Sequence, residues 1–252
     1  MPASKVAIVT GGSRGIGRST VLCLAKQGVH AIFTYKSNRT EADKVVALSA
    51  ESGAQAIALQ LDAGNTRTFD GFAGEVRKAL AELGVERFDY LVNNAGTSSS
   101  ASLETITEAE MDALYNVHFK GVLFLTQKLL PLMNDGGRIV NISSGLARFA
   151  MPNRIGYGPI KAAVEALTRY MAVELAPRRI IANVVAPGAI ATDFSGGIVR
   201  DNPQVNKAVA DHTALGRAGV PEDVGPVIAA LLSDAFGWVN AQRIEVAGGI
   251  HI

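Results

Sequence analysis

A tyrosine and a lysine stand four residues apart in this chain, at Tyr157 and Lys161. On a helix this spacing places both side chains on one face, about one turn apart. A phenol has an ordinary pKa of about 10, and a neighbouring ammonium group lowers that pKa and favours proton exchange near neutral pH. The pair is therefore a candidate for general acid–base catalysis, although a solvent-exposed pair without function would have the same spacing.

Two adjacent serines, Ser143 and Ser144, follow the apolar run 138–142. Adjacent residues of a strand face opposite sides, so only one of the two hydroxyls can point toward a site at the end of that strand. Such a hydroxyl could donate a hydrogen bond to a substrate carbonyl. The strand pattern alone does not say which serine does so.

A glycine-rich segment, TGGSRGIG at residues 10–17, joins a predicted strand to a predicted helix. Without Cβ atoms the backbone can approach a pyrophosphate closely, and the helix N-terminus adds free N–H groups and a partial positive charge. The spacing differs from G-x-G-x-x-G and lacks the Lys-Ser/Thr ending of a P-loop. Its place between strand and helix favours a dinucleotide site over an ordinary turn.

The second predicted strand ends in TYKSN at residues 34–38, without an acidic residue. An acid at that place would bind both ribose hydroxyls of NAD and repel a 2′-phosphate. Lys36 instead offers a positive charge, Ser37 and Asn38 offer hydrogen-bond donors, and Arg14 could reach the same phosphate. We therefore expect NADP(H) as cofactor; the alternative is a solvated lysine and arginine beside a turn.

Short apolar runs alternate with longer helical segments along the chain. Continuous apolar runs indicate parallel strands buried on both faces, and repeated β-α-β units place helices on both sides of the sheet. We predict an α/β fold: one doubly wound Rossmann domain over residues 1–252 with a mostly parallel seven-stranded sheet. The expected strands are 6–10, 31–35, 56–61, 90–92, 138–142, 181–185 and 243–246, and the expected helices are 16–26, 41–51, one from 108, one from 157 to before 177, and one from 221.

Composition excludes several classes of protein. The 252 residues are 48% hydrophobic and carry a formal net charge of +1, which argues against a nucleic-acid surface. No apolar run could span a membrane and the N-terminus lacks a signal-peptide pattern, so we expect a cytoplasmic protein. The single Cys23 cannot form an internal disulfide. The four histidines show no metal-ligand spacing, so no metal is expected, and no G-x-S-x-G elbow of a serine hydrolase occurs.

Taken together, the motifs resemble the short-chain dehydrogenase/reductase family, in its single-domain branch. The resemblance covers nearly the whole chain, and its motifs stand in the order of the family. They are TGGSRGIG (10–17), Asp62, NNAG (93–96), Asn116, ISS (142–144), YGPIK (157–161) and PGAIAT (187–192).

The resemblance implies the catalytic roles. Tyr157 would give a proton to the carbonyl oxygen in reduction, and Lys161 would lower the pKa of Tyr157 and hold the nicotinamide ribose. The family spacing to the tyrosine selects Ser144 as the residue that orients the carbonyl. Asn116 would hold a bend in its helix and a water that relays protons to Lys161, whereas His118 is expected to be a packing or interface residue.

The resemblance also implies the nucleotide site. Asp62 would contact the adenine, Asn93, Ala95 and Gly96 the adenosine side, and Ile190 and Thr192 the nicotinamide. The full expected set is Gly11, Ser13, Arg14, Gly15, Ile16, Gly17, Tyr35, Lys36, Ser37, Leu61, Asp62, Asn93, Ala95, Gly96, Tyr157, Lys161, Pro187, Gly188, Ile190 and Thr192.

We expect an NADPH-dependent carbonyl reductase of ketones or aldehydes, reversible as an alcohol dehydrogenase. A second hypothesis is a 3-oxoacyl-[acyl-carrier-protein] reductase, whose acidic partner needs basic residues at the site entrance. Arg148, Arg154 and Arg178 are candidates for it, although Asn134-Asp135 stands where such reductases tend to be basic. A third is a non-catalytic NADP-binding regulator, against which the intact serine, tyrosine and lysine argue.

Three further features set expectations. Segment 194–212 contains Gly196-Gly197 and a predicted helix at 204–211, and it is either a flap over the substrate or a rigid surface loop. Gly158-Pro159 stands where the family usually has small Ser or Ala residues, which alters the substrate-side wall. Relatives form tetramers, and the apolar end Ile250-His251-Ile252 is expected at a subunit contact.

Overall fold

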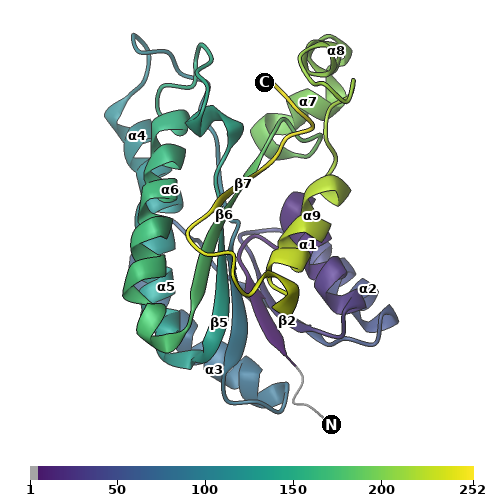
Figure 1. Ribbon diagram of the computed structural model, residues 1–252, viewed down its shortest axis with the longest axis vertical. Coiled ribbons are helices and arrows are strands. Elements are labelled where there is room, and N and C mark those ends of the chain that lie inside the picture. The colour runs from purple at the N-terminus through teal and green to yellow at the C-terminus, as the bar shows by residue number, and fades with distance from the viewer. Residues whose placement is uncertain (1–4) are drawn as a thin grey trace.

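Seven parallel strands form one sheet in the order β3-β2-β1-β4-β5-β6-β7, in a computed structural model that describes residues 5–252 (Figure 1). β1 stands within the sheet, and the chain adds strands outward from it in two series. The predicted α/β fold is confirmed, and every strand pairing within the described residues is parallel. The strands are β1 (Val6–Val9), β2 (His30–Tyr35), β3 (Ala56–Gln60), β4 (Phe88–Asn93), β5 (Met133–Ile142), β6 (Ile181–Pro187) and β7 (Arg243–Val246).

Helices cover both faces of the sheet (Figure 1). One apolar cluster joins the sheet to α1 (Gly15–Lys26), α2 (Arg39–Glu51) and α9 (Pro221–Leu231). A second cluster joins it to α3 (Phe69–Glu82), α5 (Gly121–Leu129) and α6 (Tyr157–Glu174). Burial on both faces explains why the strands read as continuous apolar runs rather than alternating ones.

Helix α3 is the one long element that the sequence did not predict. Its two glycines, Gly71 and Gly74, weaken its intrinsic preference for a helix. The helix forms because Phe69, Phe72 and Leu80 are all buried in the core below the sheet. Burial of large apolar side chains outweighs local propensity here.

The helix after β4 is interrupted. It begins as α4 (Glu108–Tyr115), where Thr107 and Glu110 form the capping box that the sequence predicts. A π-helical turn, Asn116–Lys120, separates α4 from α5. A π-turn adds one residue to the helical repeat and changes which side chains point toward the sheet.

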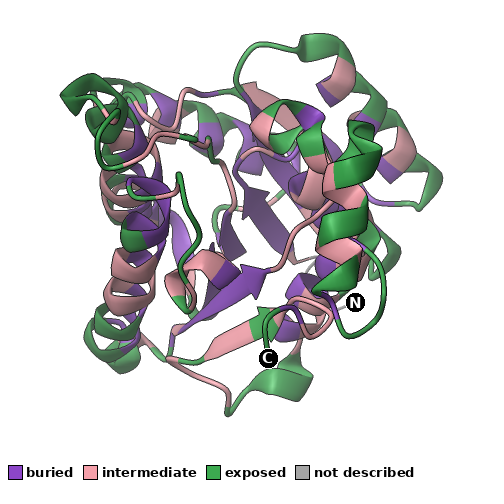
Figure 2. Ribbon diagram, turned by 90° about the horizontal axis from the view of Figure 1, so that it is seen from above, coloured by how far each residue is buried: buried purple, intermediate pink, exposed green. Residues whose placement is uncertain are grey.

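The chain after β6 rises above the carboxyl ends of the strands (Figure 1). It contains a short 3-10 turn (Phe194–Gly197), α7 (Ile198–Asp201) and α8 (Pro203–Asp211). The predicted helix at 204–211 is thus confirmed, with Asn202 as its cap. We call residues 194–212 the flap; seen from above, the molecule shows this region as mostly exposed or intermediate (Figure 2).

The C-terminal segment folds back onto its own chain. Ile250 forms a bridge with Thr213 and is 5% exposed, whereas Ile252 is 95% exposed. The expectation that the whole apolar end needs a subunit contact is therefore wrong for Ile250, since its own chain buries it. Within residues 5–252, no helix has both the length and the apolar composition of a membrane span.

Candidate active site

Tyr157 and Lys161 lie at the start of α6, where both side chains are buried against the end of β5. The Lys161 ammonium donates a hydrogen bond to the carbonyl oxygen of Ile142 at 2.8 Å. The same nitrogen lies 5.6 Å from the centre of the Tyr157 ring. The four-residue spacing therefore places the two groups on one face of the helix, as predicted.

Burial dominates the ionisation of both groups. It raises the pKa of Tyr157 above its ordinary value, while the nearby Ser144 hydroxyl and the Arg154 guanidinium act in the opposite direction. It also lowers the pKa of Lys161 to about 7. The expectation that Lys161 lowers the pKa of Tyr157 stays a prediction, since burial sets the direction of the shift at both groups. Tyr157 is therefore a protonated acid.

The two serines at the end of β5 point in different directions. The Ser143 hydroxyl is buried and donates to the Glu165 carboxylate at 2.7 Å, on the side of α6. The Ser144 hydroxyl accepts from the backbone N–H of Leu146 at 3.2 Å and lies close to the Tyr157 phenol. The geometry therefore favours Ser144, the residue that the family spacing also selects.

The glycine-rich loop leaves no room for side chains. Gly11 and Gly15 have positive φ angles of 65° and 55°. A Cβ on Gly17 would lie 2.2 Å from the carbonyl oxygen of Gly11. The first turn of α1 contains no acidic residue, and its cap residue Arg14 makes no capping side-chain hydrogen bond. Free N–H groups beside a close backbone fit a pyrophosphate.

The NNAG segment at residues 93–96 forms hydrogen bonds with the start of the glycine-rich loop. The Thr10 hydroxyl accepts from the backbone N–H groups of Asn94 and Ala95, at 2.9 and 3.0 Å. The Asn94 amide donates to the carbonyl oxygens of Thr10 and Gly11, at 2.9 and 3.2 Å. These bonds fix the end of β4 against the loop that follows β1.

Asn93 does not turn its side chain toward this site. Its amide donates to Asn141 at 2.8 Å and to Thr126 at 3.1 Å, in a buried polar group below the sheet edge. Strand alternation directs this side chain into the core, so the predicted contact of Asn93 with the nucleotide would have to come from its backbone.

The basic residues expected at a 2′-phosphate have separate partners. Lys36 pairs with Asp62 at 2.9 Å, and this contact lowers the pKa of Asp62. Arg14 pairs with Asp193 at 3.6 Å. The structure thus does not bring Arg14 and Lys36 onto one group, although both side chains are largely exposed. Tyr35 and Leu61, at the ends of β2 and β3, are buried beside them.

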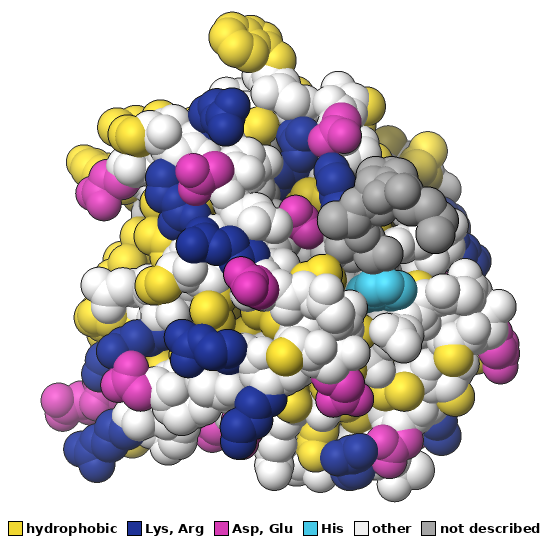
Figure 3. Space-filling model, turned by 90° about the horizontal axis from the view of Figure 1, so that it is seen from below, with side chains coloured by type: hydrophobic (Ala, Val, Ile, Leu, Met, Phe, Trp, Pro, Cys, Tyr) yellow, Lys and Arg dark blue, Asp and Glu magenta, His cyan; other side chains and the backbone are white. Residues whose placement is uncertain are grey.

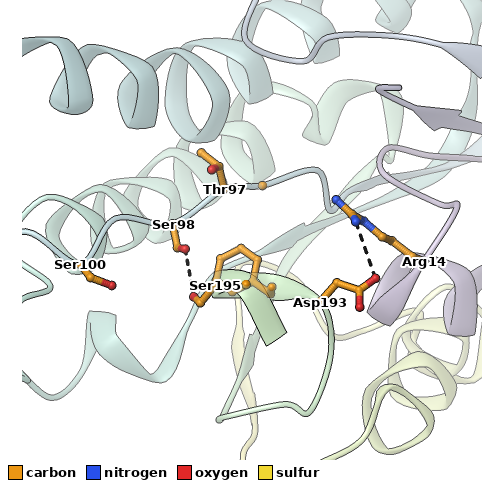
Figure 4. A pocket seen from close by; sticks show the side chains of 9 residues that line it. Arg14, Thr97, Ser98, Ser100, Asp193 and Ser195 are labelled. Carbon is orange, nitrogen blue, oxygen red and sulfur yellow. Dashed lines mark hydrogen bonds and ion pairs between the residues drawn. The ribbon is translucent and has the colours of Figure 1, made fainter. Parts of the chain in front are cut away.

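A cavity of about 330 Å³ opens between the end of β4 and the base of the flap. Among its lining residues, Arg14 forms an ion pair with Asp193 at 3.6 Å, and the hydroxyls of Ser98 and Ser195 meet at 2.9 Å (Figure 4). The Phe194 ring lies 5.9 Å from the Tyr157 ring, centroid to centroid. The cavity lining therefore runs from Arg14 of the glycine-rich loop to Phe194, which faces Tyr157.

The residues predicted to hold the nicotinamide follow β6 on the other side of the loop. The methyl group of Thr192 lies 3.4 Å from where a Cβ on Gly15 would be, so Thr192 faces the glycine-rich loop. Ile190 is held by a bridge to Gly219. Pro187 is the last residue of β6. Gly188 packs closely on Ala247, and a Cβ on Gly188 would lie 2.9 Å from the Cα of Ala247.

Asn116 lies where the family resemblance predicts a bend in the helix. It begins the π-turn, and its carbonyl oxygen accepts from the backbone N–H of Gly121. Its side-chain amide makes no hydrogen bond to another residue between 5 and 252. The side chain that this turn directs at Tyr157 is His118, which the sequence suggested only as a packing residue.

Several residues at the cavity escaped the sequence analysis. Asp193, Ser98 and Ser195 are ordinary surface types whose partners lie far away in the chain. Arg154 is three residues before Tyr157 and donates to the carbonyl oxygen of Ser99 at 2.9 Å. Unlike these three residues, Arg154 was expected at the site entrance, and its hydrogen bond to Ser100 of the cavity lining agrees with that place.

Comparison with known proteins shows the family of the chain. Residues 11–251 match the family model described as Enoyl-(Acyl carrier protein) reductase. An uncharacterised oxidoreductase of Methylorubrum extorquens is 37% identical over 247 residues, covering 98% of each chain.

Two solved structures have the same fold over nearly their whole length. The promiscuous reductase LugOII, which catalyses keto-reduction at C1 during lugdunomycin biosynthesis, aligns with a TM-score of 0.93 and 36% identity, covering 99% of this chain and 98% of its own. The angucycline C-6 ketoreductase LanV with bound NADP aligns with a TM-score of 0.93 and 31% identity, covering 98% and 96%. The chain therefore belongs to the short-chain dehydrogenase/reductase family of oxidoreductases.

Proposed function

We propose that the protein is an NADPH-dependent carbonyl reductase of ketones or aldehydes, and that it also catalyses the reverse oxidation of the alcohol. One observation carries this proposal: a buried Tyr157 stands beside the Ser144 hydroxyl and Lys161, and its ring lies 5.9 Å from that of Phe194, which lines the cavity. This is the arrangement that a carbonyl oxygen needs when it gains a proton.

The mechanism follows from the three side chains. The hydroxyls of Ser144 and Tyr157 donate hydrogen bonds to the carbonyl oxygen and hold its carbon toward the nucleotide. Bound NADPH supplies the hydride that adds to this carbon. Tyr157 transfers its proton to the oxygen, which becomes the alcohol, and the remaining phenolate is stabilised by the Lys161 ammonium. In the reverse direction the phenolate accepts the proton of the alcohol.

The choice of NADPH rests on charge at the ends of β1 and β2. Lys36 and Arg14 are exposed cations, and a 2′-phosphate would compete with Asp62 and Asp193 for them. Bound NADP in the related LanV structure supports the same choice. The narrow glycine-rich loop fits the pyrophosphate of either nucleotide, so the 2′-phosphate contacts decide between them.

The solved relatives also bear on the substrate, since LugOII and LanV are both described as reducing a keto group. A reductase of acyl-carrier-protein substrates is less well supported. Arg148 forms an ion pair with Glu245. Arg178 pairs with Asp135 near the start of β5, at the end of the sheet away from the cavity. Figure 3 shows that end, where basic and acidic side chains are mixed. Arg178 was therefore wrongly expected at the entrance.

We further propose a cytoplasmic homotetramer. Its support is the outer face of α6, where Tyr170 and Val173 are 70% and 73% exposed, and Trp238, which is 99% exposed. Apolar side chains in such positions favour contacts between subunits. The single cysteine is in keeping with a reducing compartment.

The test of the proposed function is NADPH oxidation by the purified protein, followed by the absorbance of the reduced nicotinamide. The substrates are a panel of ketones, β-keto esters and 3-oxoacyl thioesters, and the Tyr157→Phe variant is the negative control. Turnover of simple ketones supports the proposal. Turnover of the thioesters alone would favour the carrier-protein reductase, and turnover of none of them would contradict a reductase function.

A further inference from the structure

His118 is a buried titratable residue to which the proposed mechanism gives no role. Its side chain is 1% exposed and comes from the π-turn between α4 and α5. It lies where three elements meet: this turn, the Thr97 end of the cavity wall and the start of α6. π-turns are frequently found at functional sites, because they redirect one side chain without ending the helix.

A hydrogen bond ties the imidazole to the cavity wall. Its Nε2 atom lies 2.7 Å from the carbonyl oxygen of Thr97 and 3.2 Å from the backbone nitrogen of the same residue. Two lone pairs would repel at 2.7 Å, so we assign the proton to Nε2, which donates to the carbonyl oxygen. Thr97 and its neighbour Ser98 line the cavity, so the bond positions the wall that faces the substrate.

The same imidazole packs against the catalytic tyrosine. The rings of His118 and Tyr157 meet nearly at right angles, 86°, with their centroids 5.3 Å apart. Edge-to-face contacts of this kind favour one orientation of both rings. His118 therefore joins the position of the phenol to the position of the cavity wall.

Gly96 makes room for this arrangement. A Cβ on Gly96 would lie 2.8 Å from Cε1 of His118 and 3.6 Å from its Nδ1. Gly96 also lines the cavity, so only one residue of backbone separates the imidazole from the space where ligands bind. A side chain at position 96 would therefore clash with the imidazole of His118 in this position.

We propose that His118 is a positioning residue of the reaction, which holds the Tyr157 ring in register with the Thr97–Ser98 wall of the cavity. This inference rests on the proposed function. Burial and the nearby Lys161 both lower the pKa of His118 well below its ordinary value, so the imidazole is neutral near pH 7. Lys161 and Tyr157, both of α6, are the titratable groups that face it.

Two substitutions separate hydrogen bonding from packing. His118→Gln places an amide N–H near the position of Nε2 and can still donate to Thr97. His118→Phe keeps an aromatic ring against Tyr157 but has no donor. Ser49→Ala is the matched control, since Ser49 is a buried residue of α2 whose hydroxyl donates to the carbonyl oxygen of Val45 at 2.9 Å, far from the cavity.

We expect His118→Phe to lower kcat about tenfold or more while the Kd of NADPH changes less than about twofold, because His118 is not itself one of the residues assigned to the nucleotide. His118→Gln should keep kcat within about threefold of the wild type. The pH profile is the second readout: on the acid side, well below the ordinary imidazole pKa of 6.5, the wild type should lose kcat with one ionisation that His118→Gln does not show.

The outcomes are decisive. Wild-type kcat in a folded His118→Phe variant would overturn the inference, and so would an equal loss in both variants. If His118→Phe does not fold, identical acid limbs in the profiles of the wild type and His118→Gln would overturn it. If the wild type itself turns over no carbonyl substrate, the proposed function has failed rather than the role of His118.

Discussion

The aromatic ring of Phe194 lies 5.9 Å from that of Tyr157, centroid to centroid, with the two planes inclined at 55°. Phe194 opens the flap, whereas Tyr157 begins α6. The flap therefore contacts the residue that we propose as the proton donor. Any movement of this segment changes both the shape of the cavity and the surroundings of the phenol.

The first prediction concerns closure of the flap. Ser98→Ala removes the hydrogen bond to Ser195 that ties the flap to the cavity wall. We expect faster hydrogen exchange in residues 194–212 and a changed preference among substrates, with little effect on the Kd of NADPH. Ser102→Ala is the control, since the Ser102 hydroxyl lies 3.1 Å from the Thr105 hydroxyl on the same exposed loop and does not contact the flap. Slow exchange in the free protein that stays unchanged on binding would show a rigid loop.

The second prediction concerns proton donation. Tyr157→Phe keeps the ring and removes the transferable proton, so kcat should fall about 10²-fold or more. The Kd of NADPH should be nearly unchanged. Tyr170→Phe, on the exposed face of the same helix, is the control and should be fully active. Near-normal turnover by the purified Tyr157→Phe protein would refute the assignment.

The third prediction concerns Lys161. Its pKa is about 7 in the folded protein and its ordinary value is 10.5. Between these values the unfolded chain binds more protons at this site, so the free energy of unfolding rises with pH.

Compared with Lys161→Met, the wild type should gain up to about 1.4 kcal/mol of stability per pH unit across that interval. Urea unfolding of both proteins at several pH values measures the difference. A difference that does not vary with pH would mean that Lys161 keeps an ordinary pKa.

The fourth prediction concerns the nucleotide. Lys36→Ala and Arg14→Ala should each lower the ratio of kcat/KM for NADPH over NADH by about tenfold, the loss of one charged contact to a phosphate. The effect should weaken at high salt. Lys44→Ala is the control, because Lys44 pairs with Glu41 on the exposed side of α2. A wild-type preference for NADH would contradict the assignment.

The fifth prediction concerns assembly. Light scattering should give the mass of four chains. A charge at Val173, introduced as Val173→Glu, should dissociate the assembly because it must be desolvated at a contact. A wild-type protein that stays monomeric at micromolar concentration would exclude the tetramer.

The strands could be predicted from the sequence, and so could the choice of Ser144 as the serine of the proposed site. The run at 138–142 is apolar because both faces of β5 are covered, and the spacing from Ser144 to Tyr157 is a family constant. Asn93 shows the limit of such reasoning. The sequence places Asn93 at the end of β4, but it does not tell that its side-chain amide bonds to Asn141 and Thr126 in the core.

Other features depend on three-dimensional contacts that no local pattern encodes. Arg14 meets Asp193, and Ser98 meets Ser195, only because β1, β4 and β6 end at one edge of the sheet. The position of His118 depends on a π-turn, which shifts the helical register by a residue. For the same reason, helical periodicity alone did not predict that His118 would face Tyr157.

β1 pairs with β2 on one side and with β4 on the other, although β4 is not made until residue 93 has been added. On the ribosome the N-terminal β-α-β unit of β1, α1 and β2 can form early, but one edge of β1 stays without its partner. Thr10 receives its bonds from Asn94 and Ala95 only after β4 has joined. Thr192 reaches the glycine-rich loop later still. The nucleotide can therefore stabilise the finished enzyme but not the nascent chain.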